Sequence, residues 1–302
     1  MIDLGRLRAL HAVALYGSVG SAADALGYTP SAVSQQLAKL ERETRTTLLE
    51  KRGRGVVLTD AAQELAATAS KVLELVEDAE LRLEEQRGQA IGELVVAAFP
   101  TAARGLLPIA LPGLIDANPA LDVRVVEMDP FDGVAAVQRG EVHIAVVHDW
   151  HNTPLTLTED LSRVKLGTDP ADVLVPTTHR LAGKESVRPT DLVGERWICQ
   201  PPGTICHDWL IRTMRKAGVE PDVVYSVAEY QTQIAMLDRG LGIGMIPRLG
   251  RGPLPAGVTA VPLQPVVSRR LYAVWRTATA RRPAVAVTLG ALKTAWRDRS
   301  TA

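Results

Sequence analysis

Between residues 17 and 43, apolar and polar positions alternate with a helical period that is interrupted at one corner. Ser18 can cap a short helix ending near Leu26, because its hydroxyl can accept from the free amides of a first turn. Gly27 supplies the corner. Thr29 and Pro30 mark the start of a second helix. The Thr29 hydroxyl can cap it, and the Pro30 ring fixes φ at the helical value in the first helical position. The pattern predicts two helices joined by a tight turn.

The second helix, expected over residues 30–43, has two unlike faces. Val33, Leu37 and Leu40 recur at i, i+4 and i+7 and predict an inward apolar stripe. The other face is short, polar and largely uncharged: Ser31, Ser34, Gln35, Ala38 and Arg42. Serine and glutamine suit the edges of DNA bases, and glutamine can bind adenine through two hydrogen bonds. Long charged side chains would stop at the phosphates instead. This face is therefore predicted to contact bases.

Basic residues follow this helix. Residues 42–54 hold five arginines and lysines but two acids, and Arg52-Gly-Arg-Gly55 before an apolar run predicts a small hairpin wing. Two arginines on a wing suit phosphates or a minor groove. The alternative to a DNA-binding unit is a small helical hairpin whose charges are merely solvated. The helix caps, the corner, the polar face and the basic wing together favour DNA binding. The DNA-binding candidates are Ser18, Thr29, Pro30, Ser31, Ser34, Gln35, Arg42, Arg52 and Arg54.

A long helix is expected over residues 61–87, which contain neither glycine nor proline. Asp60 precedes Gln63 by three residues, as in a capping box. Leu65, Val72 and Ala79 recur every seven residues along a helix about 40 Å long. Little would hold such a helix alone, so its apolar seam is predicted to pack on a second copy, or alternatively on its own DNA-binding domain. A dimer would place two reading heads about 34 Å apart on DNA.

After Gly88 and Gly92 the pattern changes to short apolar runs alternating with helices, which predicts an α/β fold. The expected strands cover residues 94–99, 123–126, 144–147, 172–176, 197–199, 223–227, 243–246 and 270–275. The expected helices cover residues 106–118, 130–139, 207–217 and 231–239, with a last one after Pro283. The order predicts two similar α/β lobes, with the C-terminus returning to the first.

These elements divide the chain into an all-α winged helix-turn-helix over residues 1–60, a linker helix over 61–90 and a two-lobed α/β domain over 91–302. Lobe I takes about 91–167 and 268–302, and lobe II about 168–267. Loops after the carboxyl ends of parallel strands and the exposed amides of helix starts are natural sites for a carboxylate in a cleft between lobes. The ligand-binding candidates are Thr101, Ala102, Asp129, His148, Gly203, Thr204, Ile205 and Gln231. For Thr101, Thr204 and Gln231 the alternative is ordinary helix capping.

Charge and composition limit the location and the partners. The 34 basic and 34 acidic residues balance, so any contact with nucleic acid is expected to be local. No apolar run reaches the roughly 18 residues of a membrane span, and no basic start followed by an apolar run marks a signal peptide. The sequence thus predicts a cytoplasmic protein without membrane contact. Two cysteines are too few for a disulfide scaffold.

Over its whole length the chain resembles the LysR-type transcriptional regulators. The resemblance is most specific over residues 7–60, where the matching positions are Gly17-Ser18, Ala22-Ala23, Leu26, Ala32-Val33-Ser34, Leu40-Glu41, Leu48 and Leu58-Thr59. The family usually has Gln, Gly, Phe and Arg where this chain has Pro30, Arg45, Leu49 and Lys51. The resemblance implies a regulator that binds promoter DNA at an inverted repeat, as a dimer or tetramer, under control of a small-molecule effector in the cleft.

Other chemistries find less support. Peroxide-sensing members of the family use a reactive cysteine in a region similar to residues 199–206, but Cys199 lies in an apolar strand, and Cys206 has few groups nearby to lower its pKa. His143, His148 and His151 suggest a metal only if distant loops converge, so we expect no metal and no cofactor. Two other classes of function are the alternatives to a DNA-binding regulator: a solute-binding module, and an enzyme that uses Asp129 with His148. No catalytic motif supports an enzyme.

Overall fold

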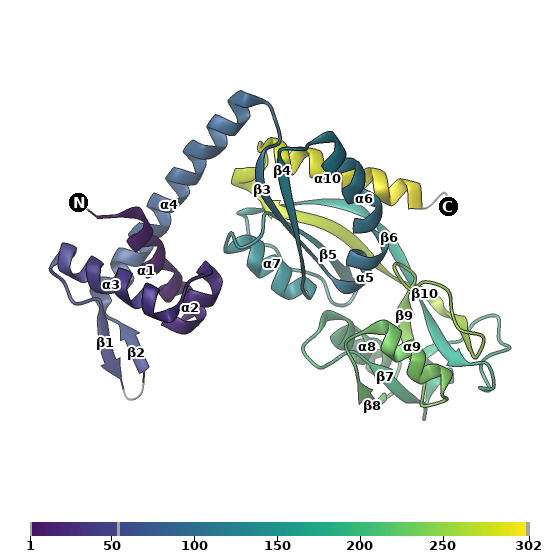
Figure 1. Ribbon diagram of the computed structural model, residues 1–302. Coiled ribbons are helices and arrows are strands. Elements are labelled where there is room, and N and C mark those ends of the chain that lie inside the picture. Colours follow the sequence, from purple (N-terminus) through teal and green to yellow (C-terminus); the bar gives the residue numbers. More distant parts are fainter. Residues whose placement is uncertain (1, 53–54, 300–302) are drawn as a thin grey trace. The chain divides into compact units, whose positions relative to one another are not determined.

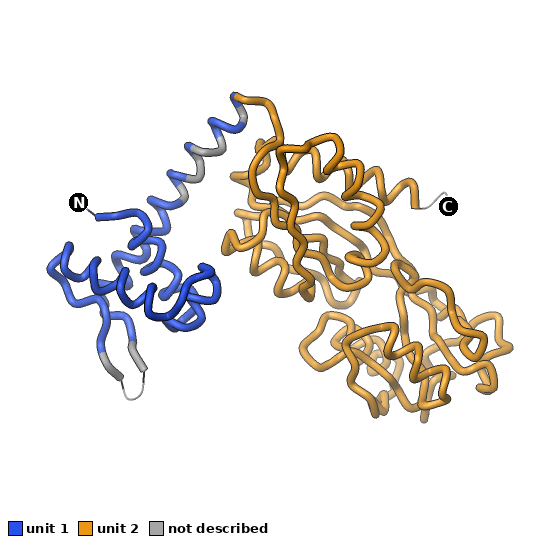
Figure 2. Tube along the Cα trace, viewed as in Figure 1, with its two compact units in different colours: residues 1–86 blue, residues 87–302 orange. Residues whose placement is uncertain are grey.

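The computed structural model describes residues 2–52 and 55–299, which form two compact units. Unit 1 covers Met1–Gln86 and unit 2 covers Arg87–Ala302 (Figure 2). The division falls at the end of the long helix α4 (Asp60–Arg87), which ends where the sequence predicted and begins one residue earlier. None of the helices in the described residues is long and apolar enough to cross a membrane.

The described residues of unit 1 form three helices and a hairpin before α4 (Figure 1). Its elements are α1 (Leu4–Tyr16), α2 (Val19–Leu26), α3 (Pro30–Thr44), β1 (Leu49–Arg52) and β2 (Gly55–Leu58). The capping predictions are confirmed: the Ser18 hydroxyl accepts from the Ser21 amide at 3.0 Å, and the Thr29 hydroxyl from the Ala32 amide at 3.2 Å. Gly27 has φ +67°, the left-handed conformation expected of the corner. Helix α1, capped by Asp3, was not among the expected elements.

The core of unit 1 forms where the expected stripe of α3 meets the other helices. Val33, Leu37 and Leu40 are fully buried and pack with Leu10 of α1 and Leu48 before the hairpin. Burying a leucine contributes roughly 1.5–3 kcal/mol relative to leaving it exposed, so this stripe fixes the orientation of α3.

One capping prediction for α4 was wrong. The cap is Thr59 and not Asp60, because the Thr59 hydroxyl accepts from the Ala62 amide at 3.1 Å and Asp60 is already the first helical residue. A hydroxyl one position earlier reaches the free amides, whereas the Asp60 carboxylate is placed to interact with the positive end of the helix dipole.

Unit 2 is built on a mixed sheet that, in its described part, has six strands in the order β4-β3-β5-β10-β6-β9. These are β3 (Gly92–Ala98), β4 (Leu121–Glu127), β5 (Ile144–Trp150), β6 (Leu161–Pro176), β9 (Gly244–Pro247) and β10 (Val258–Arg276). A parallel pair, β7 (Arg196–Cys199) and β8 (Asp222–Ser226), lies beside β9 through a bridge between Trp197 and Ile243. The helices are α5 (Pro100–Gly105), α6 (Leu107–Ala117), α7 (Pro130–Gln138), α8 (Ile205–Lys216), α9 (Tyr230–Asp238) and α10 (Pro283–Arg299), with short 3₁₀ turns at Pro189–Leu192 and Thr277–Thr279.

Two long antiparallel strands, β6 and β10, run through both lobes of unit 2 (Figure 1). Lobe I adds β3, β4, β5, α5, α6, α7 and α10 to them, and lobe II adds β7, β8, β9, α8 and α9. The sequence predicted only the short pieces 172–176 and 270–275 of these strands. The lobe limits expected at 167/168 and 267/268 fall inside them.

Two expectations about loop positions were wrong. Residues 100–102, expected as a loop after β3, form the first turn of α5, because Pro100 occupies the first helical position. The strand expected over residues 144–147 continues through His148 and Asp149, which lie within β5 and pair with Leu271 and Arg270 of β10. The long partner strand keeps β5 extended beyond the apolar run that the sequence displays.

Candidate functional site

The outer face of α3 is exposed as expected. Ser31, Ser34, Gln35 and Arg42 are all exposed, while the stripe on the opposite face is buried. The Arg42 guanidinium donates to the Ala38 carbonyl at 3.2 Å, which folds this side chain back along its own helix. The face therefore presents short polar groups on a helix whose rotation is set by the core.

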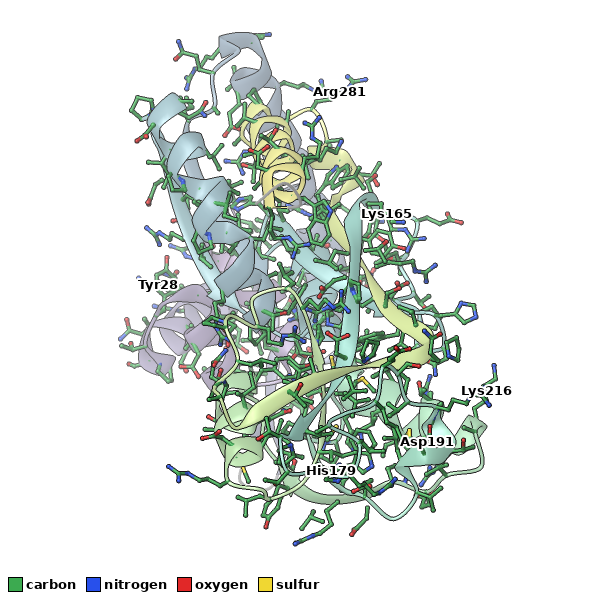
Figure 3. The ribbon with its side chains drawn as sticks, turned by 90° about the vertical axis from the view of Figure 1, so that its right-hand side faces the viewer. Tyr28, Lys165, His179, Asp191, Lys216 and Arg281 are labelled. Carbon is green, nitrogen blue, oxygen red and sulfur yellow. The ribbon has the colours of Figure 1, made fainter. Side chains whose placement is uncertain are left out.

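Tyr28 is an exposed aromatic residue that the sequence analysis did not single out. It follows the Gly27 corner, and 56% of its surface is accessible (Figure 3). Ser18, Thr29 and Pro30 are exposed around the same corner. A phenol at this place can donate a hydrogen bond to a phosphate oxygen, so Tyr28 joins the candidates for DNA contact.

The hairpin wing is held to α3 by Glu41. Its carboxylate accepts from the backbone amides of Leu48 and Leu49, at 2.8 and 3.2 Å. Charge-assisted hydrogen bonds of this kind fix the direction in which the hairpin leaves the helix. Arg52 ends β1 opposite Gly55, as the predicted wing requires, and Arg54 lies outside the described residues.

In unit 2, the helix starts α7 and α8 lie on opposite sides of the cleft between the lobes and share one carboxylate. Asp129 caps α7 by accepting from the Phe131 amide at 3.1 Å, and the Ile205 amide at the start of α8 lies close enough to lower its pKa. Burial raises the pKa of Asp129 above its usual value, against the effect of these two amides. Asp129 thus joins lobe I to lobe II.

Thr204 caps α8, so the capping alternative is confirmed for this residue. Its hydroxyl accepts from the His207 amide at 3.3 Å and lies 2.8 Å from the Pro201 carbonyl, to which it donates. Gly203, with φ +89°, lets the chain turn into the helix. The two residues fix the start of α8 in lobe II.

Thr101 and Ala102 are buried in α5 rather than exposed to the cleft. The Thr101 hydroxyl accepts from Arg269, a fully buried residue of β10. The Arg269 guanidinium also pairs with Asp169 of β6 at 2.9 Å and covers the Phe99 ring. This network ties the two long strands to α5. Sequence reasoning missed it, because its members are far apart along the chain and no local pattern marks them.

Gln231 lies on the exposed rim of lobe II. Its amide nitrogen donates to the Arg251 carbonyl at 2.7 Å, and its backbone donates to Glu229, the cap of α9. Glu229 also binds Arg104 of α5 at 2.8 Å, and Arg104 donates to the Gly250 carbonyl. These contacts close the α5 side of the cleft.

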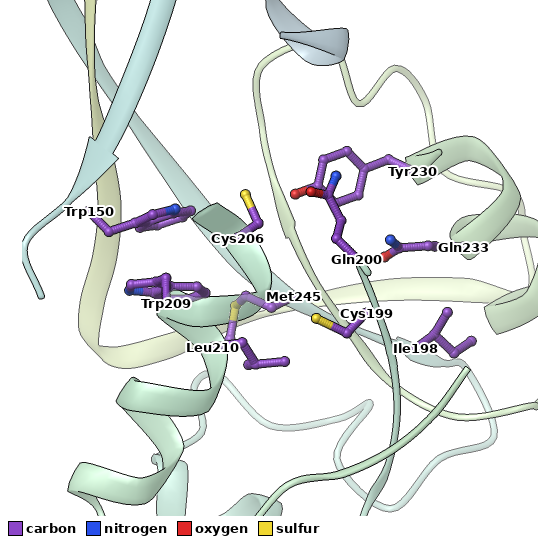
Figure 4. Close-up of a pocket in the computed structure, with 10 residues that line it drawn as sticks. All are labelled: Trp150, Ile198, Cys199, Gln200, Cys206, Trp209, Leu210, Tyr230, Gln233 and Met245. Atoms are coloured by element: carbon purple, nitrogen blue, oxygen red, sulfur yellow. The ribbon is translucent and has the colours of Figure 1, made fainter. Parts of the chain in front are cut away.

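A narrow pocket lies deeper between the lobes, and ten residues line it (Figure 4). Trp150 of β5 and Trp209 of α8 stack there, with ring centroids 3.9 Å apart and planes 16° from parallel. About 10 Å³ is open to the centre of a water molecule, which is room for about one water. None of the eight candidates is among the ten described lining residues, although Ile205 precedes Cys206 and Gln231 follows Tyr230, which do line it.

The titratable groups at this pocket are held uncharged. Burial raises the pKa of Cys199 to about 12, and burial also raises the pKa of Cys206 and that of Tyr230, which lies beside the Cys206 sulfur. Burial, helped by the Arg269 charge, lowers the pKa of His148 well below its usual value. His148 Nε2 lies 3.9 Å from Cys206 Sγ. A neutral imidazole does not stabilise a thiolate, so this pair lacks the electrostatics of a reactive cysteine.

The described residues contain no group of three or more side chains arranged to hold a metal ion. His143, one member of the histidine cluster, instead accepts from the Val95 amide at 2.8 Å, and burial lowers its pKa to about 4. Its ring therefore binds the backbone of β3, an interior strand of the sheet.

Comparison with known families decides the identity. Residues 87–297 match the family described as "LysR substrate binding domain", and residues 4–63 match "Bacterial regulatory helix-turn-helix protein, lysR family". The chain belongs to the LysR-type transcriptional regulators. This regulator is 27% identical over 276 residues to the probable HTH-type transcriptional regulator LrrA of Synechococcus elongatus, covering 90% of this chain and 91% of that one.

Two further proteins are similar to this LysR-type regulator. The hydrogen peroxide-inducible genes activator of Dickeya chrysanthemi is 27% identical over 249 residues, which cover 82% of this chain and 80% of that one. Full-length OxyR from Pseudomonas aeruginosa shares the fold with a TM-score of 0.68 at 22% identity, covering 97% of this chain and 98% of that one. The family confirms the expected combination of a helix-turn-helix with a two-lobed domain.

Proposed function

We propose that this regulator reads operator bases with α3 and that a small molecule in the cleft of unit 2 controls its binding to promoter DNA. The observation that carries the proposal is the exposed, largely uncharged face of α3, formed by Ser31, Ser34 and Gln35 over a fully buried stripe. A rigid helix with short hydrogen-bonding side chains suits direct readout in a major groove. Residues 1–60 then bind DNA, 61–90 join two copies, and 91–302 bind the effector.

Self-association through α4 is supported by two features of unit 1. Leu75 and Leu83, in the second half of α4, are 68% and 55% exposed. An apolar groove of about 400 Å³ lies between α1 and the first half of α4, where Leu15, Leu58 and Ala66 line it. An antiparallel second copy would bring its exposed leucines to this groove and remove them from water.

The cleft suits control by a ligand because both sides of it are closed by contacts between lobes. Arg104 binds Glu229 on one side, and Trp150 stacks on Trp209 on the other. A ligand shifts an equilibrium only by binding one arrangement better than another. An effector that replaces some of these contacts therefore changes the spacing of the lobes, and with it the placement of the two reading heads.

The proposal also places this regulator in the cytoplasm with its DNA and gives it no catalytic step. Support comes from the family, whose members named above are regulators, and from the neutral state of the buried His148 and Cys206. A general base or a nucleophile needs a pKa matched to its task. Burial moves the pKa of His148 and that of Cys206 away from the values such roles need.

Selection of binding sites from genomic DNA tests the function, followed by titration of the selected site and of random DNA. We expect an inverted repeat bound at least about a thousandfold more tightly than random sequence. Gln35→Ala should weaken binding to that site by about 1–3 kcal/mol and leave binding to random DNA unchanged. Arg42→Ala, which removes a charge from the end of the same face, should weaken both. Equal losses for Gln35→Ala on both DNAs would assign that residue to the backbone, and no preference for any site would overturn the function.

A further inference from the structure

The pocket between Trp150 and Gln233 is lined entirely by uncharged side chains. Of the ten described residues around it, none is an acid or a base that ionises near neutral pH, and both thiols and the Tyr230 phenol are kept protonated by burial. A charge brought into such a place loses its hydration without gaining a partner. The lining therefore disfavours both anions and cations.

Arg269, the buried cation that joins β10 to β6 and α5, is already paired. Arg269 binds Asp169 at 2.9 Å and donates to the Thr101 hydroxyl, and its side chain is 1% exposed. Asp169 is fully buried and also accepts from the Leu249 amide at 2.9 Å. Freeing Arg269 for a ligand would leave Asp169 buried with its partner lost, so this guanidinium is not available to an anionic effector.

The start of α8, where a ligand carboxylate would find free amides, is occupied by the chain itself. The Asp129 carboxylate lies beside the Ile205 amide, and its own helix holds it there through a hydrogen bond from the Phe131 amide at 3.1 Å. The negative charges of Asp132 and Asp208 act on the same carboxylate, and together with burial, the larger cause, they raise the pKa of Asp129. A second carboxylate at this place would meet the like charge of Asp129, which already occupies it.

The pocket nevertheless offers specific contacts to a neutral molecule. Among the described residues, Trp150 Nε1 is buried without a hydrogen-bond acceptor in range, although it lies near the Cys206 sulfur. A buried donor without an acceptor is costly, and a ligand oxygen can satisfy it. The stacked rings of Trp150 and Trp209 offer flat surfaces for an aromatic ring.

We propose that the cleft takes an uncharged aromatic or heteroaromatic molecule, which stacks on the Trp150–Trp209 pair and accepts a hydrogen bond from Trp150 Nε1, and that Asp129 excludes aromatic carboxylates. This assignment rests on the proposed function, because it names the class of the effector. Because the pocket has room for only about one water, the lobes must part to admit the ring of the ligand. The two indoles belong to different lobes, so their separation couples ligand binding to lobe spacing.

Calorimetric titration of the full chain with two matched pairs, benzamide with benzoate and nicotinamide with nicotinate, tests the assignment. Each pair shares a ring and differs in charge. We expect each amide to bind at least about tenfold more tightly than its carboxylate, since a buried unpaired charge is heavily penalised. Asp129→Asn, which keeps the shape and removes the charge, should reduce this preference at least about fivefold. Trp209→Phe should weaken amide binding less than Trp209→Ala, with thermal unfolding as the check on folding.

Three results would overturn the assignment: carboxylates bound as tightly as amides, a preference unchanged in Asp129→Asn, or no binding of any probe at millimolar concentration. Operator binding is measured separately, so the two proposals fail independently. A chain that selects its operator but binds no probe keeps the proposed function and loses the ligand class. A chain that binds the amides but shows no sequence preference on DNA keeps the ligand site and loses the function.

Discussion

The exposed face of α3 and the pocket between the lobes meet their ligands in opposite ways. The α3 face has Ser31, Ser34 and Gln35 open to solvent on a fixed helix. The pocket is filled by the chain's own side chains, above all the stacked Trp150 and Trp209. The first surface is complete before its ligand arrives, whereas the second has to open to bind. The affinity of α3 for DNA therefore depends on the new hydrogen bonds themselves, while the affinity of the cleft is reduced by the free energy of parting the two lobes.

The largest expected effect concerns the buried network that holds the cleft. Asp169→Ala should lower the free energy of unfolding of unit 2 by about 3–5 kcal/mol, because Arg269 stays buried without its carboxylate. All five tryptophans lie in unit 2, so their fluorescence in a urea titration follows this unit. Asp122→Ala, which removes an exposed acid paired with Arg124, is the control and should cost at most about 1 kcal/mol.

The double variant Asp169→Leu with Arg269→Met should recover most of that loss, since an apolar pair of similar size needs no desolvation of charge. A single variant as stable as the wild type would show that the network does not hold the closed cleft.

The second prediction tests how closed the pocket is. With a pKa of about 12, against 9.0 for a free thiol, Cys199 carries about a thousandfold less thiolate at pH 8, so its alkylation by iodoacetamide should be slower by at least that factor. Its rate should rise with pH until the pH passes about 12 or the protein unfolds. An exposed thiol from Lys216→Cys provides the reference (Figure 3). Fast labelling of Cys199 at pH 8 would mean that the pocket opens readily without a ligand.

The smallest effect belongs to the wing beside the open α3 face. Arg52→Ala should weaken binding to specific and random DNA alike and reduce the slope of log K against log salt by about 1, because one phosphate contact is lost. Arg281→Ala removes an equal charge from unit 2 and should leave the slope unchanged (Figure 3). A slope unaltered by Arg52→Ala would remove the wing from the set of phosphate contacts.

The same contrast explains what the sequence could predict. The ends of α2 and α3 follow from Ser18, Gly27, Thr29 and Pro30, which act on neighbours within three residues. The burial of Leu37 follows from a period within one helix. The pocket joins Trp150, Trp209 and Tyr230 from three elements, and the Arg269–Asp169 pair joins residues 100 positions apart. No local pattern marks such partners, because tertiary packing alone brings them together.

Errors in the strands have a similar origin. β10 runs for 19 residues through two lobes, and its burial pattern changes along its length as its neighbours change. The expected strand 270–275 is only the part with a continuous apolar run. α5 was not predicted because a proline directly after a strand also suits a loop, whereas here Pro100 begins a helix.

The paired course of β6 and β10 has a consequence for how such proteins are assembled and altered. The chain leaves β6 at Pro176 and returns into β10 at Val258, and these residues are register partners, with the Thr177 amide donating to the Gly257 carbonyl at 2.8 Å. The ends of the segment 177–257 are therefore adjacent, as in an insertion within a hairpin. Recombination can therefore replace the segment 177–257 of lobe II with another without breaking the pairing between β6 and β10.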